Sequence, residues 1–205
     1  MKLYFAPGAC SLAPHIVARE AGIPLDLVKV DLTTHRLADG SDYYDINPRG
    51  YVPALELDDH ALLTETAAVV PYLADLRPAS GLAPPAGTMQ RVRFHQWLTF
   101  IATELHKGFV PLWHPETARS TVVAATRKLR LRFDDLESHL DRQDYLLGKD
   151  FSAADAYAFA ILSWTAVLRI DMAGYPAITA YLQRIAARPA VQAALQAEGL
   201  LRAAA

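Results

Sequence analysis

The chain carries one cysteine, Cys10, between a strand-like run at residues 2–6 and a helix-like run that follows it. The first backbone N–H groups of a helix are unpaired and its dipole is positive at that end, and both effects favour a thiolate. A thiolate there could act as a nucleophile or bind another thiol. The alternative is that Cys10 packs as a small buried hydrophobic side chain. Because one cysteine cannot form a disulfide within the chain, disulfide chemistry at Cys10 needs a thiol from another molecule.

A second group with acid–base chemistry is His106, in the segment TELHK of a predicted long helix. Thr99, Thr103 and His106 are spaced three or four residues apart, which predicts that they share one helix face. A lone histidine on a helix is usually hydrogen-bonded within the fold or solvated. Lys107 either adds positive potential near a thiolate or is a solvated side chain. The residues alone therefore leave both roles open.

The segment TET at residues 64–66 joins a predicted strand to a predicted helix. The Glu65 carboxylate can receive an ammonium group, while the backbone N–H and hydroxyl of Thr66 suit a carboxylate. The alternative is that these residues only cap the helix. Both roles can coexist.

Val52 precedes Pro53 in the loop NPRGYVPAL, and a residue before proline is biased towards extended backbone. An exposed extended edge binds a peptide through main-chain hydrogen bonds. Only about 5–6% of X–Pro bonds in folded proteins are cis, so local sequence favours an ordinary trans Pro53. The local sequence therefore predicts extended backbone at Val52, before a trans proline.

Composition limits what these groups can belong to. The 205 residues suit one large or two small domains, and 52% hydrophobic residues with 20% charged residues predict a folded chain. The net charge of -2 does not indicate a basic surface of the kind that binds nucleic acid or an anionic membrane. No apolar run reaches the roughly 18–20 residues of a membrane span, and the N-terminus lacks a signal peptide's long apolar segment. We expect a soluble cytoplasmic protein without a metal-ligand cluster.

Hydrophobic periodicity predicts the elements that position these residues. In the first part, strand, helix and strand in succession imply a parallel pair, and a hairpin and a helix follow. Pro71 should kink the last helix or mark a misplaced boundary. The predicted elements are strands at 2–6 and 25–32, a helix at 11–22, hairpin strands at 52–57 and 61–65, and a helix at 65–76.

The segment at residues 77–87 is rich in Pro, Gly and Ala and is predicted to be a linker. Beyond it the pattern is helical throughout. In FSAADAY, Ser152 is expected to cap a helix and Asp155 to accept the backbone N–H of Ser152, as in a capping box, which is a purely structural role. The other predicted helices cover residues 89–109, 121–140, 178–187 and 191–197.

Five segments, in order and at family-like spacing, resemble the cytosolic glutathione S-transferases, and specifically their bacterial beta class. These segments are PGACSLAPH, NPRGYVPAL, TET, IATELHKGF and FSAADAY. The resemblance covers the whole chain. It implies an α/β plus all-α fold: a thioredoxin-like, glutathione-binding domain at residues 1–80, then an all-helical domain at 88–205 that lines the electrophile site.

The resemblance also implies chemistry. Glutathione is the co-substrate, its thiolate attacks hydrophobic electrophiles, and Cys10 adds glutathione-dependent peroxidase or thiol-transferase side activity through a mixed disulfide. The implied catalytic residues are Cys10, His106 and Ser11, and we leave open whether Cys10 or Ser11 donates to the glutathione thiol. The implied glutathione contacts are Cys10, His35, Val52, a cis Pro53, Glu65, Thr66, Thr99, Thr103, His106 and Lys107.

Two positions depart from the family pattern. His35 stands where lysine is common, and a neutral histidine would bind the glycyl carboxylate more weakly unless Arg36 or a protonated His35 compensates. Thr99 replaces an asparagine and lacks the two-donor amide. At the electrophile site, the residues Phe109, Trp113, His114 and Trp164 are expected either to line an apolar pocket or to belong to the core.

A homodimer is expected from the resemblance. Phe94 and Phe100 lie off the apolar line of their predicted helix, and such surface needs a cover from the same chain or from a second subunit. Two other functions stay open: a non-catalytic carrier of apolar ligands, and an interaction module that kept the fold without the activity. Binding to immobilised glutathione followed by an aryl-halide conjugation assay distinguishes all three.

Overall fold

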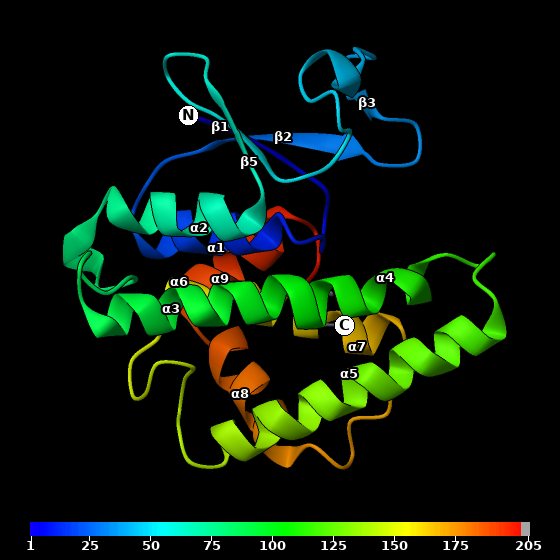
Figure 1. Cartoon of the computed structure of the whole chain (residues 1–205). Coiled ribbons are helices and arrows are strands. Elements are labelled where there is room, and N and C mark those ends of the chain that lie inside the picture. Colours follow the sequence, from blue (N-terminus) through cyan, green and yellow to red (C-terminus); the bar gives the residue numbers. More distant parts are fainter. Residues whose placement is uncertain (202–205) are drawn as a thin grey trace.

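The computed structural model describes residues 1–201, and its N-terminal part is a five-stranded mixed sheet in the order β3-β2-β1-β4-β5 (Figure 1). β1 runs parallel to β2, as the predicted strand–helix–strand unit implies, and β4 and β5 form the predicted antiparallel hairpin. The pairs β1–β4 and β2–β3 are also antiparallel, and β3 is a strand that the sequence did not predict. The elements are β1 (Lys2–Phe5), α1 (Leu12–Glu20), β2 (Asp26–Asp31), β3 (Arg36–Leu37), β4 (Ala54–Glu56), β5 (Leu62–Thr64) and α2 (Thr66–Asp75). Short 3-10 turns follow at Tyr43–Asp45 and Pro78–Ser80.

The central strand β1 is covered on both faces, which explains its nearly continuous apolar sequence. Leu3 and Phe5 belong to the core shared with the helices, whereas Tyr4 packs on the opposite side with Tyr43. The Tyr43 hydroxyl and the Asn47 amide each donate to the Tyr51 carbonyl at 2.8 Å. These bonds fix the loop that leads to Val52.

The predicted helix at 65–76 is confirmed, and its boundary was not misplaced. Pro71 lies inside α2 and is buried. Thr66 is the first residue of this helix. The beginning of α2 therefore lies directly after strand β5.

The rest of the described chain is helical, with no named strand between residues 81 and 201. The predicted helix at 89–109 is confirmed, but α3 and α4 are joined by a π-helical segment, η3, that the periodicity did not predict. The elements are α3 (Met89–Phe100), η3 (Ile101–His106), α4 (Lys107–Trp113), α5 (Arg119–Leu140), α6 (Ala153–Leu162), α7 (Trp164–Val167), α8 (Pro176–Ala186) and α9 (Pro189–Ala197).

Asp155 makes the predicted contact at the beginning of α6. Its carboxylate accepts the Ser152 backbone N–H at 2.8 Å, and it also accepts from the Leu146 N–H and the Tyr181 hydroxyl, both at 2.9 Å. Burial raises the pKa of this carboxyl group. Helix α6, helix α8 and the segment that joins α5 to α6 therefore meet at one buried acid.

Helix α1 packs against α2 on one side and against α6 and α9 on the other, so one hydrophobic core runs through both domains (Figure 1). Phe94 belongs to that core and is 0% exposed. Of the two covers left open for Phe94, the same chain or a second subunit, the structure shows the same chain. Phe100 is partly buried against the same core.

In residues 1–201 no helix combines the length and hydrophobicity needed to cross a membrane. The same part of the chain has no group of three or more His, Cys, Asp or Glu side chains that could hold a metal ion.

Candidate active site

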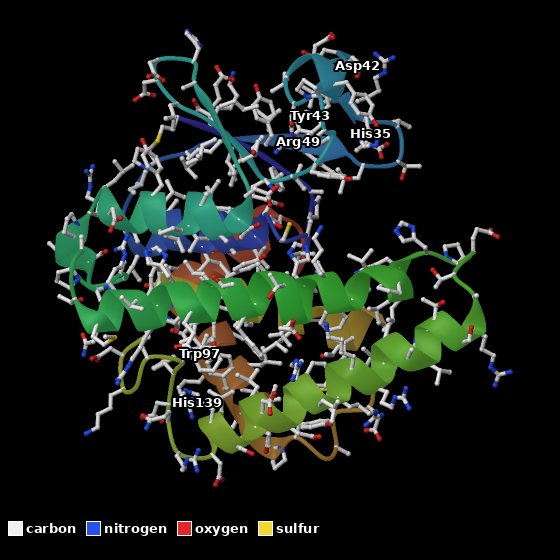
Figure 2. All side chains as sticks on the ribbon, in the orientation of Figure 1. His35, Asp42, Tyr43, Arg49, Trp97 and His139 are labelled. Atoms are coloured by element: carbon white, nitrogen blue, oxygen red, sulfur yellow. The ribbon has the colours of Figure 1, made fainter. Side chains whose placement is uncertain are left out.

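A cavity of about 720 Å³ lies where the sheet meets the helical domain. The cavity receives side chains from the β1–α1 loop, the loop before β4, the beginning of α2, and the η3–α4 region. Eight of the predicted glutathione contacts line it: Cys10, His35, Val52, Pro53, Glu65, Thr66, His106 and Lys107. A second cavity of about 450 Å³, between α3 and α5, contains none of the predicted site residues; Figure 2 shows Trp97 and His139 together there.

Among residues 1–201, three predicted site residues lie outside the lining of the larger cavity. The Ser11 side chain is 0% exposed, and its hydroxyl both accepts the Ala6 N–H and donates to the Ala6 carbonyl at 3.2 Å. Thr99 and Thr103 are exposed, and the Thr103 hydroxyl donates to the Thr99 carbonyl at 2.9 Å. Ser11 therefore stabilises the loop before Cys10 instead of facing the cavity.

Cys10 lies at the bottom of the cavity and is 8% exposed. Its Sγ donates to the Val52 carbonyl oxygen at 3.2 Å. Burial raises the pKa of the thiol to about 11, which hydrogen bonding by the Thr66 side chain and by the backbone N–H groups of Cys10 and Ser11 offsets only in part. The expected thiolate at the helix N-terminus is therefore not supported, because desolvation outweighs the helix end. Cys10 is a protonated thiol that offers an S–H donor.

The Val52–Pro53 peptide bond is cis, as the resemblance implied and against the trans form that local sequence favoured. Both residues line the cavity, directly before β4 begins at Ala54. The Val52 carbonyl already accepts the Cys10 thiol. Its backbone is thus held beside Cys10 at the edge where an extended peptide would pair.

Glu65 precedes α2 in a conformation with φ 69° and ψ 117°, which is unusual for a residue with a side chain. Its side chain is exposed and makes no capping hydrogen bond, so Glu65 does not act as a side-chain cap. Thr66 is buried at the first position of the helix, where backbone N–H groups have no helical partner. A carboxylate and a set of free N–H donors therefore stand next to each other in the lining.

His106 is the last residue of η3, and its Nδ1 lies 2.8 Å from the Tyr157 hydroxyl. Its ring meets the edge of Trp164 at a centroid distance of 5.1 Å. Burial, with a smaller contribution from Lys107, lowers the pKa of His106 to about 4. Burial also raises the pKa of Tyr157. At neutral pH this pair is therefore a neutral imidazole and a neutral phenol joined by a hydrogen bond.

At the other end of the cavity, His35 has φ 52° and its ring packs on Tyr44 at 4.6 Å. Its Nδ1 is buried and has no hydrogen-bond partner within the described residues. Arg49 lines the same cavity, and Figure 2 shows it near His35. The sequence interpretation missed Arg49, although it lies within the quoted loop NPRGYVPAL. This end of the cavity therefore carries one permanent cation and one unsatisfied ring nitrogen.

Aromatic side chains form the wall beyond His106. Trp113, His114 and Trp164 line the cavity, and the Trp113 and Trp164 rings are 5.4 Å apart. Phe109 is 0% exposed and supports Trp164 from behind at 5.7 Å, so it belongs to the core. Tyr157, which the sequence interpretation treated only as part of a capping segment, also lines the cavity.

Comparisons with known proteins agree with this arrangement. Two family models match the chain: the glutathione S-transferase N-terminal domain over residues 8–76 and the glutathione S-transferase C-terminal domain over residues 100–189. Among curated relatives, glutathione S-transferase GstA of Escherichia coli O157:H7 is 45% identical over 200 residues, covering 98% of this chain and 100% of the relative.

Solved structures give the same picture. A sphingomonad glutathione S-transferase complexed with glutathione matches with a TM-score of 0.94 and 48% identity, covering 98% of this chain and 100% of the other. A bacterial beta class glutathione S-transferase of Sphingomonas chungbukensis matches with a TM-score of 0.94 and 46% identity over the same shares of both chains.

Proposed function

Because the chain belongs to the bacterial beta class of the glutathione S-transferase family, we propose that the 720 Å³ cavity is where it binds glutathione and carries out the transfer. The protein is a glutathione transferase, and glutathione is its co-substrate. The observation that carries the assignment of the site is the meeting of Cys10, the Val52 edge, the Glu65–Thr66 helix start and His106 in one cavity.

In this proposal glutathione lies extended along the Val52 edge, with its cysteinyl part paired to the Val52 backbone. The γ-glutamyl ammonium pairs with the Glu65 carboxylate. The γ-glutamyl carboxylate accepts hydrogen bonds from the Thr66 N–H and hydroxyl at the positive end of α2. The ammonium and the carboxylate of the γ-glutamyl residue of glutathione are thus bound by two adjacent residues, Glu65 and Thr66.

The glutathione thiol is placed between Cys10 and His106. A free thiol has a pKa near 8.5, so catalysis requires donors that stabilise its thiolate. We assign the Cys10 S–H as one donor, since the pKa of about 11 keeps that thiol protonated. Ser11 is the weaker candidate because its hydroxyl is bonded to Ala6. Neutral His106, held by Tyr157, supplies an uncharged polar contact, and Lys107 adds positive potential.

The glycyl carboxylate lies at the His35 end of the cavity. We propose that Arg49 provides the permanent positive charge there and that the His35 ring, which lines the same end, adds a hydrogen bond. Hydrophobic electrophiles then approach from the wall formed by Val110, Trp113 and Trp164. These residues come from α4 and the beginning of α7, in the helical domain.

Cys10 also supports a thiol-transferase side activity. Its thiol attacks the disulfide that joins glutathione to another thiol compound, a Cys10–glutathione mixed disulfide forms, and the other compound leaves as a thiol after taking up the proton. A second glutathione attacks that mixed disulfide, releases oxidised glutathione and restores Cys10. The raised pKa of the Cys10 thiol slows this attack, because the thiolate is the attacking species.

Our proposal keeps the domain boundaries at residues 1–80 and 88–205 and takes the assembly to be a homodimer. Thr99 and Thr103 lie outside the cavity of their own chain. We therefore assign these two threonines to glutathione bound by the partner copy. Light scattering at micromolar concentration should report about twice the chain mass of 22.5 kDa. A monomer with full turnover would contradict the dimer and this use of the threonines.

Retention on immobilised glutathione, followed by conjugation to chlorodinitrobenzene, tests the site. Glu65→Ala and His106→Asn should each lower kcat/KM, whereas the matched control Trp97→Phe, in the second cavity, should not. Retention without turnover would favour a carrier function. Neither retention nor turnover would favour an interaction module.

A further inference from the structure

We propose that Glu198 and His15 are positioning residues for Cys10, because they fix the Pro7–Ala9 loop that determines where the thiol lies. Glu198 follows α9, and His15 lies on α1. This inference rests on the proposed function in one respect, namely that Cys10 faces bound glutathione. The position of the thiol itself can be measured without glutathione.

The loop is held at Gly8, two residues before Cys10. The Gly8 N–H donates to Glu198 Oε2 at 3.0 Å, and the Gly8 carbonyl accepts from Trp164 Nε1 at 2.8 Å. Both partners come from the helical domain, more than 150 residues away in the chain. Gly8 has φ 71°, and a Cβ there would lie 3.5 Å from the Leu200 side chain. The helical domain thus holds both polar groups of one residue in the loop.

The Glu198 carboxylate also holds α1. Its side chain is 0% exposed, and Oε1 lies 2.9 Å from Nδ1 of His15, which is 2% exposed. Arg19 Nε donates to His15 Nε2 at 3.3 Å. Since arginine can only donate, Nε2 accepts and the ring proton is assigned to Nδ1, which donates to Glu198. Each carboxylate oxygen therefore takes one donor, one from the loop and one from the helix on either side of Cys10.

Joining α1 to α9 does not by itself require Glu198. Arg188 already donates to Glu20 at 2.6 and 2.9 Å, which links the same two helices without touching the loop. What Glu198 adds is the bond to Gly8. Trp164, the other partner of Gly8, also contacts His106 and lines the cavity. The contacts of Gly8 with Glu198 and Trp164 therefore position both the loop before Cys10 and the aromatic wall of the cavity.

The test compares Glu198→Gln and Glu198→Ala with the matched control Glu20→Gln. A glutamine side chain has one acceptor oxygen and one NH2 donor where the carboxylate has two acceptor oxygens. One of the two N–H donors then faces the NH2 group, so the loop or the helix loses its bond. We measure alkylation of Cys10 by iodoacetamide from intact mass, the KM and kcat with glutathione and chlorodinitrobenzene, and the melting temperature. All measurements are made well below the lowest melting temperature.

We expect Cys10 in both Glu198 variants to be alkylated about tenfold faster than in Glu20→Gln, which corresponds to the loss of one charge-assisted hydrogen bond. The KM for glutathione should rise in these variants and stay unchanged in the control. If Glu198→Ala does not fold, the near-isosteric Glu198→Gln gives the same comparison.

Equal alkylation rates and KM values in Glu198→Gln and Glu20→Gln would overturn the proposal and leave Glu198 a purely structural role. The proposed function is judged separately. If the unmodified protein fails to turn over glutathione while alkylation still accelerates in Glu198→Gln, the positioning role stands and the glutathione site falls.

Discussion

Replacing Glu65 separates the stability of the protein from its affinity for glutathione. The positive φ of 69° at this residue is sparsely populated when a Cβ is present, and such a conformation costs about 1–3 kcal/mol. Glycine removes that cost but adds about 0.5–1 kcal/mol of backbone entropy lost on folding. Glu65→Gly should therefore be more stable than Glu65→Ala by about 1 kcal/mol, because alanine keeps the Cβ and the strain.

The affinity for glutathione, by contrast, should fall equally in both variants. Glu65 is exposed in the cavity lining and carries no internal partner, so removing its side chain leaves nothing unpaired inside the protein. Both variants lose the charge-assisted pairing with the glutathione ammonium, worth about 1.5–3 kcal/mol. The dissociation constant should therefore rise by about 10- to 150-fold in Glu65→Ala and Glu65→Gly alike.

Urea denaturation of the ligand-free protein gives the stability, and calorimetric titration with glutathione gives the affinity. Every variant is compared at one protein concentration, since the stability of an oligomer depends on concentration. If Glu65→Gly is less stable than Glu65→Ala, the backbone at this residue is not strained. If both dissociation constants stay within twofold of the unmodified protein, Glu65 does not bind the ammonium.

Three further predictions concern the rest of the site. Cys10→Ala should abolish the single adduct that oxidised glutathione forms, as seen by intact mass, yet should still conjugate aryl halides at a reduced rate; complete loss of turnover with intact binding would make Cys10 essential. His35→Lys should lower the KM for glutathione several-fold at pH 8 by restoring a permanent charge; an unchanged KM would mean that Arg49 alone serves the glycyl carboxylate. For His106, a pKa lowered from 6.5 to about 4 means that only the unfolded chain binds this proton between those values. Stability should therefore fall as the pH falls from about 6.5 to about 4, and denaturation of His106→Asn should show a shallower fall than that of the unmodified protein.

Features set by neighbouring residues were predictable from the sequence. The Asp155 contact with the Ser152 N–H depends on a spacing of three residues, and the β1–α1–β2 unit depends on hydrophobic periodicity, so both could be predicted. The turn of Ser11 towards Ala6 is local as well. The sequence interpretation missed it because a serine beside a cysteine at the beginning of a helix was expected to have a catalytic role. Its hydroxyl instead bonds the backbone of Ala6.

Features set by distant residues could not be predicted in this way. The protonation state of Cys10 depends on its burial by other elements, which raises the pKa of the thiol. The positive end of α1, considered alone, predicted a thiolate. The cover over Phe94 and the bond from Gly8 to Glu198 join parts of the chain that no local pattern connects. A helix end, a lone thiol or an apolar side chain can each lie in several different environments. Which environment it has depends on how distant parts of the chain pack around it.

The π-helical segment η3 sets the rotational phase of the helix that follows it. Each residue of an α-helix advances about 100° around the axis, so the one extra residue taken into a π-type turn rotates everything after it by about that angle. In an uninterrupted α-helix of the same sequence, His106 would point away from Tyr157 and Trp164, and the wall carried by α4 would turn with it. Deleting a single residue between Ile101 and Leu105 would remove that extra residue and leave an uninterrupted α-helix in which α4 keeps its phase. The π-type turn therefore lets this helix carry one more residue while the wall on α4 stays turned towards the cavity.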